Sequence, residues 1–246
     1  MFSACTALSS VTIPSNVTRI EDYAFQSCTN LPNQTMPTGL TYIGASAFYA
    51  CNKLSSVVIP DSVTTINNWA FGNSTGITSV TLPNNITTLS NGVFAGCKSL
   101  KELVIPDSVT SIGNGALSGC TALSSVTMST NITSIGQASF RGDTALTSLE
   151  IPNSVTTISA SAFTSCNKVT SFTVPSGVSS IEAAIFSGCT SLTGITFTRE
   201  NPANVKNDNA FANTNNCPIY VPSEYVETYK GNYYWRNLKD RIQAIP

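Results

Sequence analysis

Hydrophobic and polar positions along the chain repeat with a period of 23 residues. The aromatic position of this pattern is filled, at nine successive intervals, by Phe2, Phe25, Phe48, Phe71, Phe94, Leu117, Phe140, Phe163 and Phe186. Apolar residues replace one another at this and the other apolar positions, so these positions face an interior. Repetition at a fixed period of this length predicts a solenoid, in which each coil packs only against its neighbours.

Each coil is predicted to contain two short strands and one helical turn. Residues 103–105 alternate between inward and outward positions, as a strand does, and Pro106 ends the strand because proline cannot donate to a ladder. Residues 109–112 are a second extended piece rich in β-branched residues. Residues 114–120 space their apolar members at helical intervals. The sequence therefore predicts an α/β repeat solenoid that is dominated by β-structure.

The pattern divides the chain into two parts. Residues 1–197 make nine coils of one solenoid, and because Phe2 already stands in register we expect the chain to begin in mid-coil. The period fails after Phe197, so residues 198–246 are predicted to be a degenerate last repeat and a C-terminal cap.

The C-terminal part carries helix signals and aromatic residues. Ser223 is predicted to be the N-cap of a helix over residues 224–230, which Gly231 ends. The residues Tyr233, Tyr234 and Trp235 follow directly. They either cover the last coil or form a binding patch, since Tyr and Trp are enriched in interfaces.

One polar position of the repeat is nearly always cysteine. Its occupants are Cys5, Cys28, Cys51, Ser74, Cys97, Cys120, Asp143, Cys166 and Cys189. Because Ser74 and Asp143 are accepted there, the position calls for a small side chain that hydrogen-bonds locally, and we expect buried free thiols. A disulfide framework is the alternative. A metal site is disfavoured because the chain has no Cys-x-x-Cys motif and no histidine.

The charge balance excludes some classes of partner. The chain has 12 Lys+Arg and 13 Asp+Glu, without a basic cluster, which argues against nucleic acid because that binding depends on neutralised phosphates. No apolar run is long enough to span a membrane, so we expect no membrane insertion. The outward positions are mainly Ser, Thr and Asn, a composition commoner outside cells, and no motif calls for a cofactor.

The repeat resembles the BspA-like leucine-rich repeats, a 23-residue class found in bacterial and protozoan cell-surface proteins. The matching words are Ala-Phe-x-x-Cys, as in residues 24–28, and Leu-x-x-Val-x-Ile-Pro, as in residues 54–60. The tail from Ile219 to Ser223 is also similar. The resemblance implies a right-handed leucine-rich-repeat superhelix, an extracellular or cell-surface location, and adhesion to host matrix proteins, other cells or polymers. It brings no catalytic residues, so the protein is not expected to be an enzyme.

In leucine-rich solenoids the outward residues of the first strand form a concave binding face. Here these residues are mostly Ser and Thr, and the departures are Glu102, Val104 and Glu150. The candidate binding residues are Ser79, Thr81, Glu102, Val104, Ser125, Thr127, Ser148 and Glu150. The two glutamates are two coils apart, roughly 10 Å by strand spacing. Such a separation suits paired-carboxylate chemistry, but no other feature supports an enzyme.

Three functions remain open from the sequence. The first is a surface or secreted module that binds a protein partner through the concave face. The second is a structural spacer within a larger surface protein, which the uniformity of that face favours. The third is a glycan-binding module, for which the aromatic candidates are Trp69 and residues 233–235. We place Trp69 in the Ala position beside Phe71 and predict that it packs inside.

Overall fold

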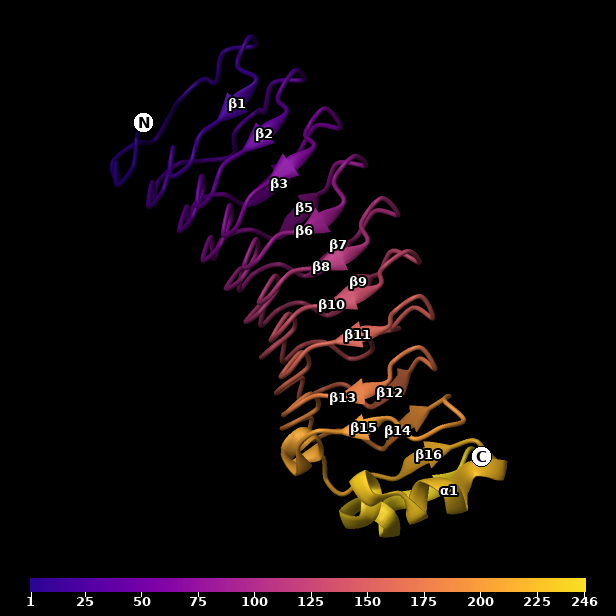
Figure 1. Ribbon diagram of the computed structural model, residues 1–246. Helices are drawn as coiled ribbons and strands as arrows, with labels where there is room; N and C mark the ends of the chain where they lie inside the picture. The colour runs from indigo at the N-terminus through magenta and orange to yellow at the C-terminus, as the bar shows by residue number, and fades with distance from the viewer.

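The computed structural model describes residues 1–246, apart from the side chain of Asp208. The chain winds into a solenoid of about ten turns with few helices, stacked in one row from the N-terminus to a small helical region at the C-terminus (Figure 1). This confirms the predicted β-dominated repeat solenoid. We call the two strands of each coil the first and second strand, in chain order, and the residues that follow the second strand the turn segment.

The first strands pair in parallel along one side of the stack. Two pairs and one larger sheet result, with orders β3-β5, β7-β9 and β12-β14-β16-β17. The strands are β3 (Ser56–Val58), β5 (Ser79–Thr81), β7 (Glu102–Val104), β9 (Ser125–Thr127), β12 (Ser171–Val174), β14 (Gly194–Phe197), β16 (Ile219–Val221) and β17 (Ile242–Ala244). Register is kept from coil to coil, so residues 23 apart are partners from β3 to β14.

The second strands pair in parallel in three sheets of their own, with orders β1-β2-β4, β11-β10-β8-β6 and β13-β15. They are β1 (Arg19–Ile20), β2 (Tyr42–Ile43), β4 (Thr65–Ile66), β6 (Thr88–Leu89), β8 (Ser111–Ile112), β10 (Ser134–Ile135), β11 (Thr157–Ile158), β13 (Ser180–Ile181) and β15 (Asn204–Val205). Each ends on a buried aliphatic residue, which fixes the face that the ladder turns inward.

The turn segments differ from the predicted helical turn. Residues 114–119 form consecutive turns, in which Gly115 and Gly119 have φ of 60° and 75°. A left-handed residue interrupts an α-helix of L-residues. The amides of Gly115, Leu117 and Gly119 instead donate to carbonyls of the next coil at 2.8–2.9 Å. The segment therefore makes a third set of hydrogen bonds between coils, on every second residue.

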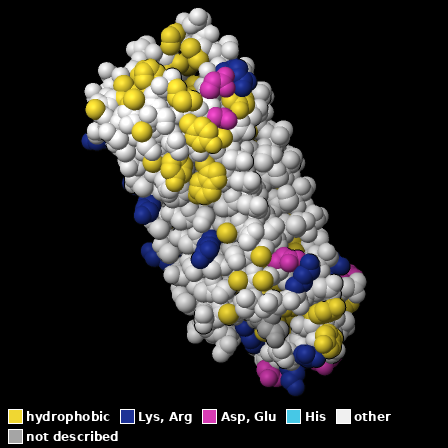
Figure 2. Space-filling view, turned by 60° about the vertical axis from the view of Figure 1, so that its left-hand side comes forward, with side chains coloured by type: hydrophobic (Ala, Val, Ile, Leu, Met, Phe, Trp, Pro, Cys, Tyr) yellow, Lys and Arg dark blue, Asp and Glu magenta, His cyan; other side chains and the backbone are white. Residues whose placement is uncertain are grey.

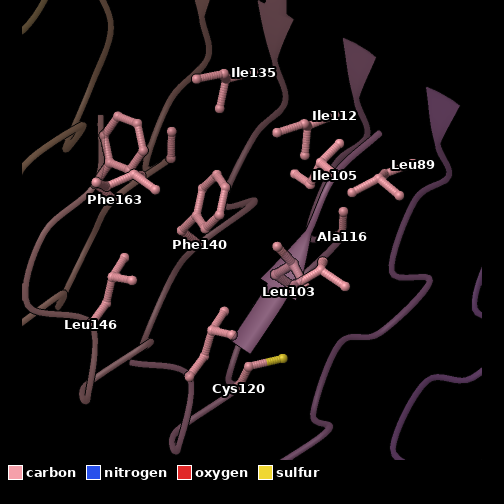
Figure 3. Packing of buried hydrophobic residues seen from close by; sticks show 14 of the residues in the cluster. Leu89, Leu103, Ile105, Ile112, Ala116, Cys120, Ile135, Phe140, Leu146 and Phe163 are labelled. Atoms are coloured by element: carbon pink, nitrogen blue, oxygen red, sulfur yellow. The ribbon is translucent and has the colours of Figure 1, made fainter. Parts of the chain in front are cut away.

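The interior is a set of stacked columns. The rings of Phe25, Phe48, Phe71 and Phe94 stack with centroid separations of 5.2–5.6 Å. Figure 3 shows the same column at Phe140 and Phe163, with Leu103, Ile105 and Ile112 facing it from the strands. Stacked ring pairs at this separation stabilise the fold beyond the hydrophobic gain from burying the rings. Because each ring packs against rings of the preceding and following coils, each coil is held mainly by its two neighbours.

The cysteine column is hydrogen-bonded along its length. The thiols of Cys51, Cys97 and Cys120 each donate to the carbonyl of the aromatic residue in the preceding coil, at 3.0–3.2 Å. Ser74 makes the same bond at 2.6 Å through its hydroxyl. The cysteines are free, and all except Cys5 are buried. The predicted small side chain that hydrogen-bonds locally is confirmed.

The C-terminal region closes the last coil. Its helices are η1 (Asp208–Phe211), η2 (Ser223–Tyr225), α1 (Val226–Gly231) and η3 (Tyr233–Arg241). The indole of Trp235 is fully buried against Phe197 at 5.1 Å, and its Nε1 donates to the Ala203 carbonyl at 2.7 Å. Tyr229 is also buried and donates to the Arg199 carbonyl.

The predicted start of the C-terminal helix is wrong. The α-helix begins at Val226, after a 3-10 turn, and Ser223 makes no capping bond. The turn is preceded by Pro222, whose extended backbone continues from β16. The helix includes Gly231 and has Asn232 as its C-cap, so it ends one residue later than predicted.

Candidate binding face

The outward residues of the first strands make one continuous face. Glu102 pairs with Ser125 and Val104 with Thr127 across β7 and β9, while Ser79 and Thr81 lie on the neighbouring strand β5. All six side chains are exposed. The structure therefore brings these six predicted residues together on one surface. Strands β7 and β9 are paired with each other, whereas β5 is paired with β3 and lies beside β7.

Strand pairing does not continue from β9 to the next coil, and a hollow lies at this point. Residues 148–151 form no strand, although Leu149 and Ile151 remain buried. A hollow of about 490 Å³ lies between β9 and this segment, lined by Ser125, Thr127, Ser148, Glu150 and Asn153 among others. The last two of the eight predicted residues, Ser148 and Glu150, thus lie across the hollow from β9.

Two apolar side chains stand out on this polar face. Val104 is 64% exposed and Val58 is 61% exposed, at a position that elsewhere in the ladder is usually Thr. Val104 lies between the two glutamates in chain order and one strand from the hollow. Val58 lines a second hollow, with Asn33 and Thr35, toward the N-terminus. Only in its middle coils, therefore, does this face combine an exposed apolar side chain with acidic side chains.

The buried thiols of the cysteine column are poorly suited to nucleophilic chemistry. Burial raises the pKa of the Cys51 and Cys97 thiols to about 12, so neither is a ready nucleophile. Among the described residues no cluster of three or more His, Cys, Asp or Glu side chains could hold a metal ion. No helix in the described chain is both long and apolar enough to cross a bilayer.

The secondary aromatic candidates separate into two kinds. Tyr233 and Tyr234 are exposed, and the guanidinium of Arg236 lies 4.3 Å from the Tyr233 ring centre. Trp235 is buried against the last coil, so its assignment as a binding residue is wrong. Its packing partners are Phe197, Phe211 and Tyr229, and the alternative role predicted for it, covering the last coil, is the one that it fills.

The prediction for Trp69 is also wrong. Ala70 occupies the buried Ala position beside Phe71, and Trp69 stands one residue earlier, on the outside of the turn segment. Trp69 is 42% exposed and contacts Tyr49, with 6.4 Å between ring centroids. The 23-residue spacing does indicate the correct position, because it aligns Trp69 with Gly92 and Gly115 and not with the Ala position.

Comparison with known proteins agrees with the coil geometry. The BspA type leucine-rich repeat region, in six copies, matches residues 1–124 and 112–239. The chain belongs to the BspA type leucine-rich repeat family. The resemblance seen in the Ala-Phe-x-x-Cys words is thereby confirmed. A search of curated proteins found no match.

Solved structures similar to this BspA-type solenoid are bacterial leucine-rich repeat proteins. A leucine-rich repeat protein from Eubacterium ventriosum is 30% identical with a TM-score of 0.58, and the match covers 62% of this chain and 41% of that one. A leucine rich cell surface protein from Faecalibacterium prausnitzii is 26% identical with a TM-score of 0.50, covering 80% and 67%. A leucine-rich repeat protein from Bacteroides ovatus is 24% identical with a TM-score of 0.54, covering 100% and 80%, and shows the shared fold.

Proposed function

We propose that this solenoid is a non-catalytic module of a cell-surface or secreted protein, and that it binds a protein partner through the face of its first strands. The family and the name of the Faecalibacterium prausnitzii relative support a surface location. The observation that carries the binding proposal is the hollow beside β9, which Glu150 lines, with Glu102 and exposed Val104 on the adjacent strand β7.

The chemistry of this region suits a protein partner of moderate affinity. Protein interfaces combine an apolar contact at the centre with a polar rim. Val104 supplies the apolar contact, and the Ser and Thr hydroxyls around it supply hydrogen bonds. Glu102 and Glu150 favour a partner surface with basic side chains, because complementary charge accelerates association and excludes wrong partners.

Binding of the purified chain to a panel of matrix proteins and to whole cells tests the proposal. Val104→Thr introduces the residue that the neighbouring strands β5 and β9 carry at this position, so the ladder is preserved. We expect Val104→Thr, Glu102→Ser and Glu150→Ser together to weaken binding about tenfold or more, which corresponds to about 1.4 kcal/mol. Surface plasmon resonance at two salt concentrations measures both the affinity and the contribution of charge.

Val58→Thr is the matched control, because Val58 is about as exposed as Val104 on the same face but lies two coils to the N-terminal side of Val104, away from the hollow beside β9. It is expected to bind as the unaltered chain does. Equal binding by the triple variant, or no binding to any member of the panel, would favour the spacer role instead.

A further inference from the structure

Trp69 occupies a backbone position that a bulky residue rarely takes. Its φ is 61°, in the left-handed region that favours glycine. The equivalent residues in the next three coils are Gly92, Gly115 and Ala138. Tyr23, two coils before Trp69, has a φ of 58° and is likewise about half exposed. The left-handed backbone is common to this position of the repeat, since Ser46, Ser161 and Ala184 also have positive φ, so the feature that sets Trp69 and Tyr23 apart is the exposed aromatic side chain.

The indole of Trp69 lies flat on the following coil. A Cβ added at Gly92 would be 2.5 Å from both Cδ2 and Cε2 of the indole and 2.7 Å from Cε3. Three atoms of one ring at nearly equal distance from this point place the ring face over Gly92. Gly92 is buried and Trp69 is 42% exposed, so the exposed part of the indole lies away from Gly92. The Cε3 atom also lies 2.9 Å from the position of a Cβ added at Gly72. Tyr49 adjoins the indole at an interplanar angle of 66°.

Amide and hydroxyl groups surround the two rings. The side-chain oxygen of Asn68 accepts from the Asn91 amide at 3.1 Å, and that of Asn91 accepts from the Asn114 amide at 2.7 Å. These bonds orient the exposed side chains, and their NH₂ groups are available as donors. Asn73 donates to the Tyr49 hydroxyl, whose own hydrogen can then be given to a ligand.

The turn segments that carry these groups are uncharged. Residues 45–50, 68–73 and 90–96 contain no Asp, Glu, Lys or Arg. Figure 2, which brings the turn segments forward, shows hydrophobic side chains with ring systems gathered over the N-terminal half of this face. Acidic and basic side chains lie beside the upper rings, whereas the lower rings are surrounded mainly by uncharged side chains. An apolar ring face inside a border of neutral donors complements a ligand that has an apolar face and many hydroxyls.

We propose that Trp69 and Tyr49 form a binding site for a neutral glycan, on the turn segments and separate from the first-strand face. One pyranose ring would lie on the exposed part of the Trp69 indole with its C–H groups against the ring. Its hydroxyls would accept from the amides of Asn68 and Asn91 and from the Tyr49 hydroxyl. The absence of charged residues from these segments favours a neutral sugar over a uronic or sialic acid. Tyr23, about 10 Å along the same column by coil spacing, directly follows Glu21 and Asp22 and lies outside this uncharged region.

Affinity electrophoresis of the full chain in gels that contain a neutral glucan, mannan, galactan or xylan tests this site. Trp69→Gly restores the glycine found in the next two coils and removes the left-handed strain, so the variant is expected to fold. We expect at least one polysaccharide to retard the unaltered chain. Trp69→Gly should weaken that binding about tenfold or more, since burial of one aromatic face contributes on this scale.

Two further measurements make the outcome decisive. The chain has two tryptophans and Trp235 is buried, so acrylamide should quench mainly Trp69, and the retarding polysaccharide should protect it. Tyr233→Ala removes another exposed aromatic and should bind as the unaltered chain does. Retardation by none of the four polysaccharides, equal retardation of Trp69→Gly, or a protein ligand found instead on this patch would overturn the proposal. The triple variant of the first-strand face should keep glycan binding, which separates this site from the proposed protein-binding face.

Discussion

The interior of the middle coils and the outer surface of the same coils follow different rules. Inside, Ser74 replaces a cysteine and makes the same hydrogen bond to the preceding coil, and Leu117 replaces a phenylalanine and stays fully buried. Outside, Val104 replaces a threonine and Trp69 a small residue, and both are left at least partly exposed. Interior replacements thus preserve a contact that the stack requires, whereas surface replacements add a side chain that the stack does not require.

The largest effect is expected from breaking the interior. Phe94→Ala removes a fully buried ring from the aromatic column and should lower the free energy of unfolding by about 3–5 kcal/mol. Phe94→Leu is the matched control, because Leu117 fills the same position one coil later. It should cost much less, and urea denaturation followed by circular dichroism measures both. Equal losses of unfolding free energy for Phe94→Ala and Phe94→Leu would contradict the claim that side-chain volume in this column determines stability.

Asp143 is the interior replacement that fits its position least well. Burial raises the pKa of its carboxyl well above the usual range, although the Cys120 amide donates to Oδ1 at 2.9 Å and opposes this shift. Oδ2 is buried without a partner among the described atoms. A protonated Oδ2 could donate a hydrogen bond, as the thiols of the column do, whereas a carboxylate could not.

Asp143→Ser should therefore stabilise the solenoid at alkaline pH. Because the pKa is raised on folding, the native state holds an extra proton above pH about 4, and stability falls as the pH rises toward the folded pKa. Serine, already present as Ser74, removes this dependence. An unpaired buried acceptor costs about 1–3 kcal/mol, so the gain should approach that size at pH 9 and vanish near pH 3.

Urea denaturation across this pH range is the measurement. Asp107→Ser, at an exposed aspartate, is the control and should show no such trend. A constant difference between Asp143→Ser and the unaltered chain at every pH would exclude a titrating Asp143.

The repeat made most of the fold predictable from the sequence. The residues that replace one another at a given position of the repeat reveal its period and its buried apolar columns. They also reveal the hydrogen-bonding role of the cysteine position. The turn segments were predicted as helical because apolar spacing does not reveal a left-handed backbone at Gly115 and Gly119. The buried position of Trp235 was left open because a cap and a binding patch call for the same aromatic residues.

The candidate site was predictable only in part. Glu102, Val104 and Glu150 were found because they break an otherwise uniform column. The hollow beside β9 depends on the loss of strand pairing at residues 148–151, and Leu149 and Ile151 keep the apolar alternation there, so the sequence pattern gives no sign of it. Trp69 was missed through a register error of one residue, which moves a side chain from the interior to the surface.

The central claim is that the residues proposed to bind a partner are not needed for folding. Its most direct test is the stability of a chain that carries Glu102→Ser, Val104→Thr and Glu150→Ser together. All three side chains are exposed, and surface replacements of this kind change stability by no more than about 0.5 kcal/mol each. The free energy of unfolding in urea at pH 7 should therefore remain within about 1.5 kcal/mol of the unaltered chain. A loss of about 3 kcal/mol or more, comparable to that of a core truncation, would show that these residues hold the coils together and would contradict the account.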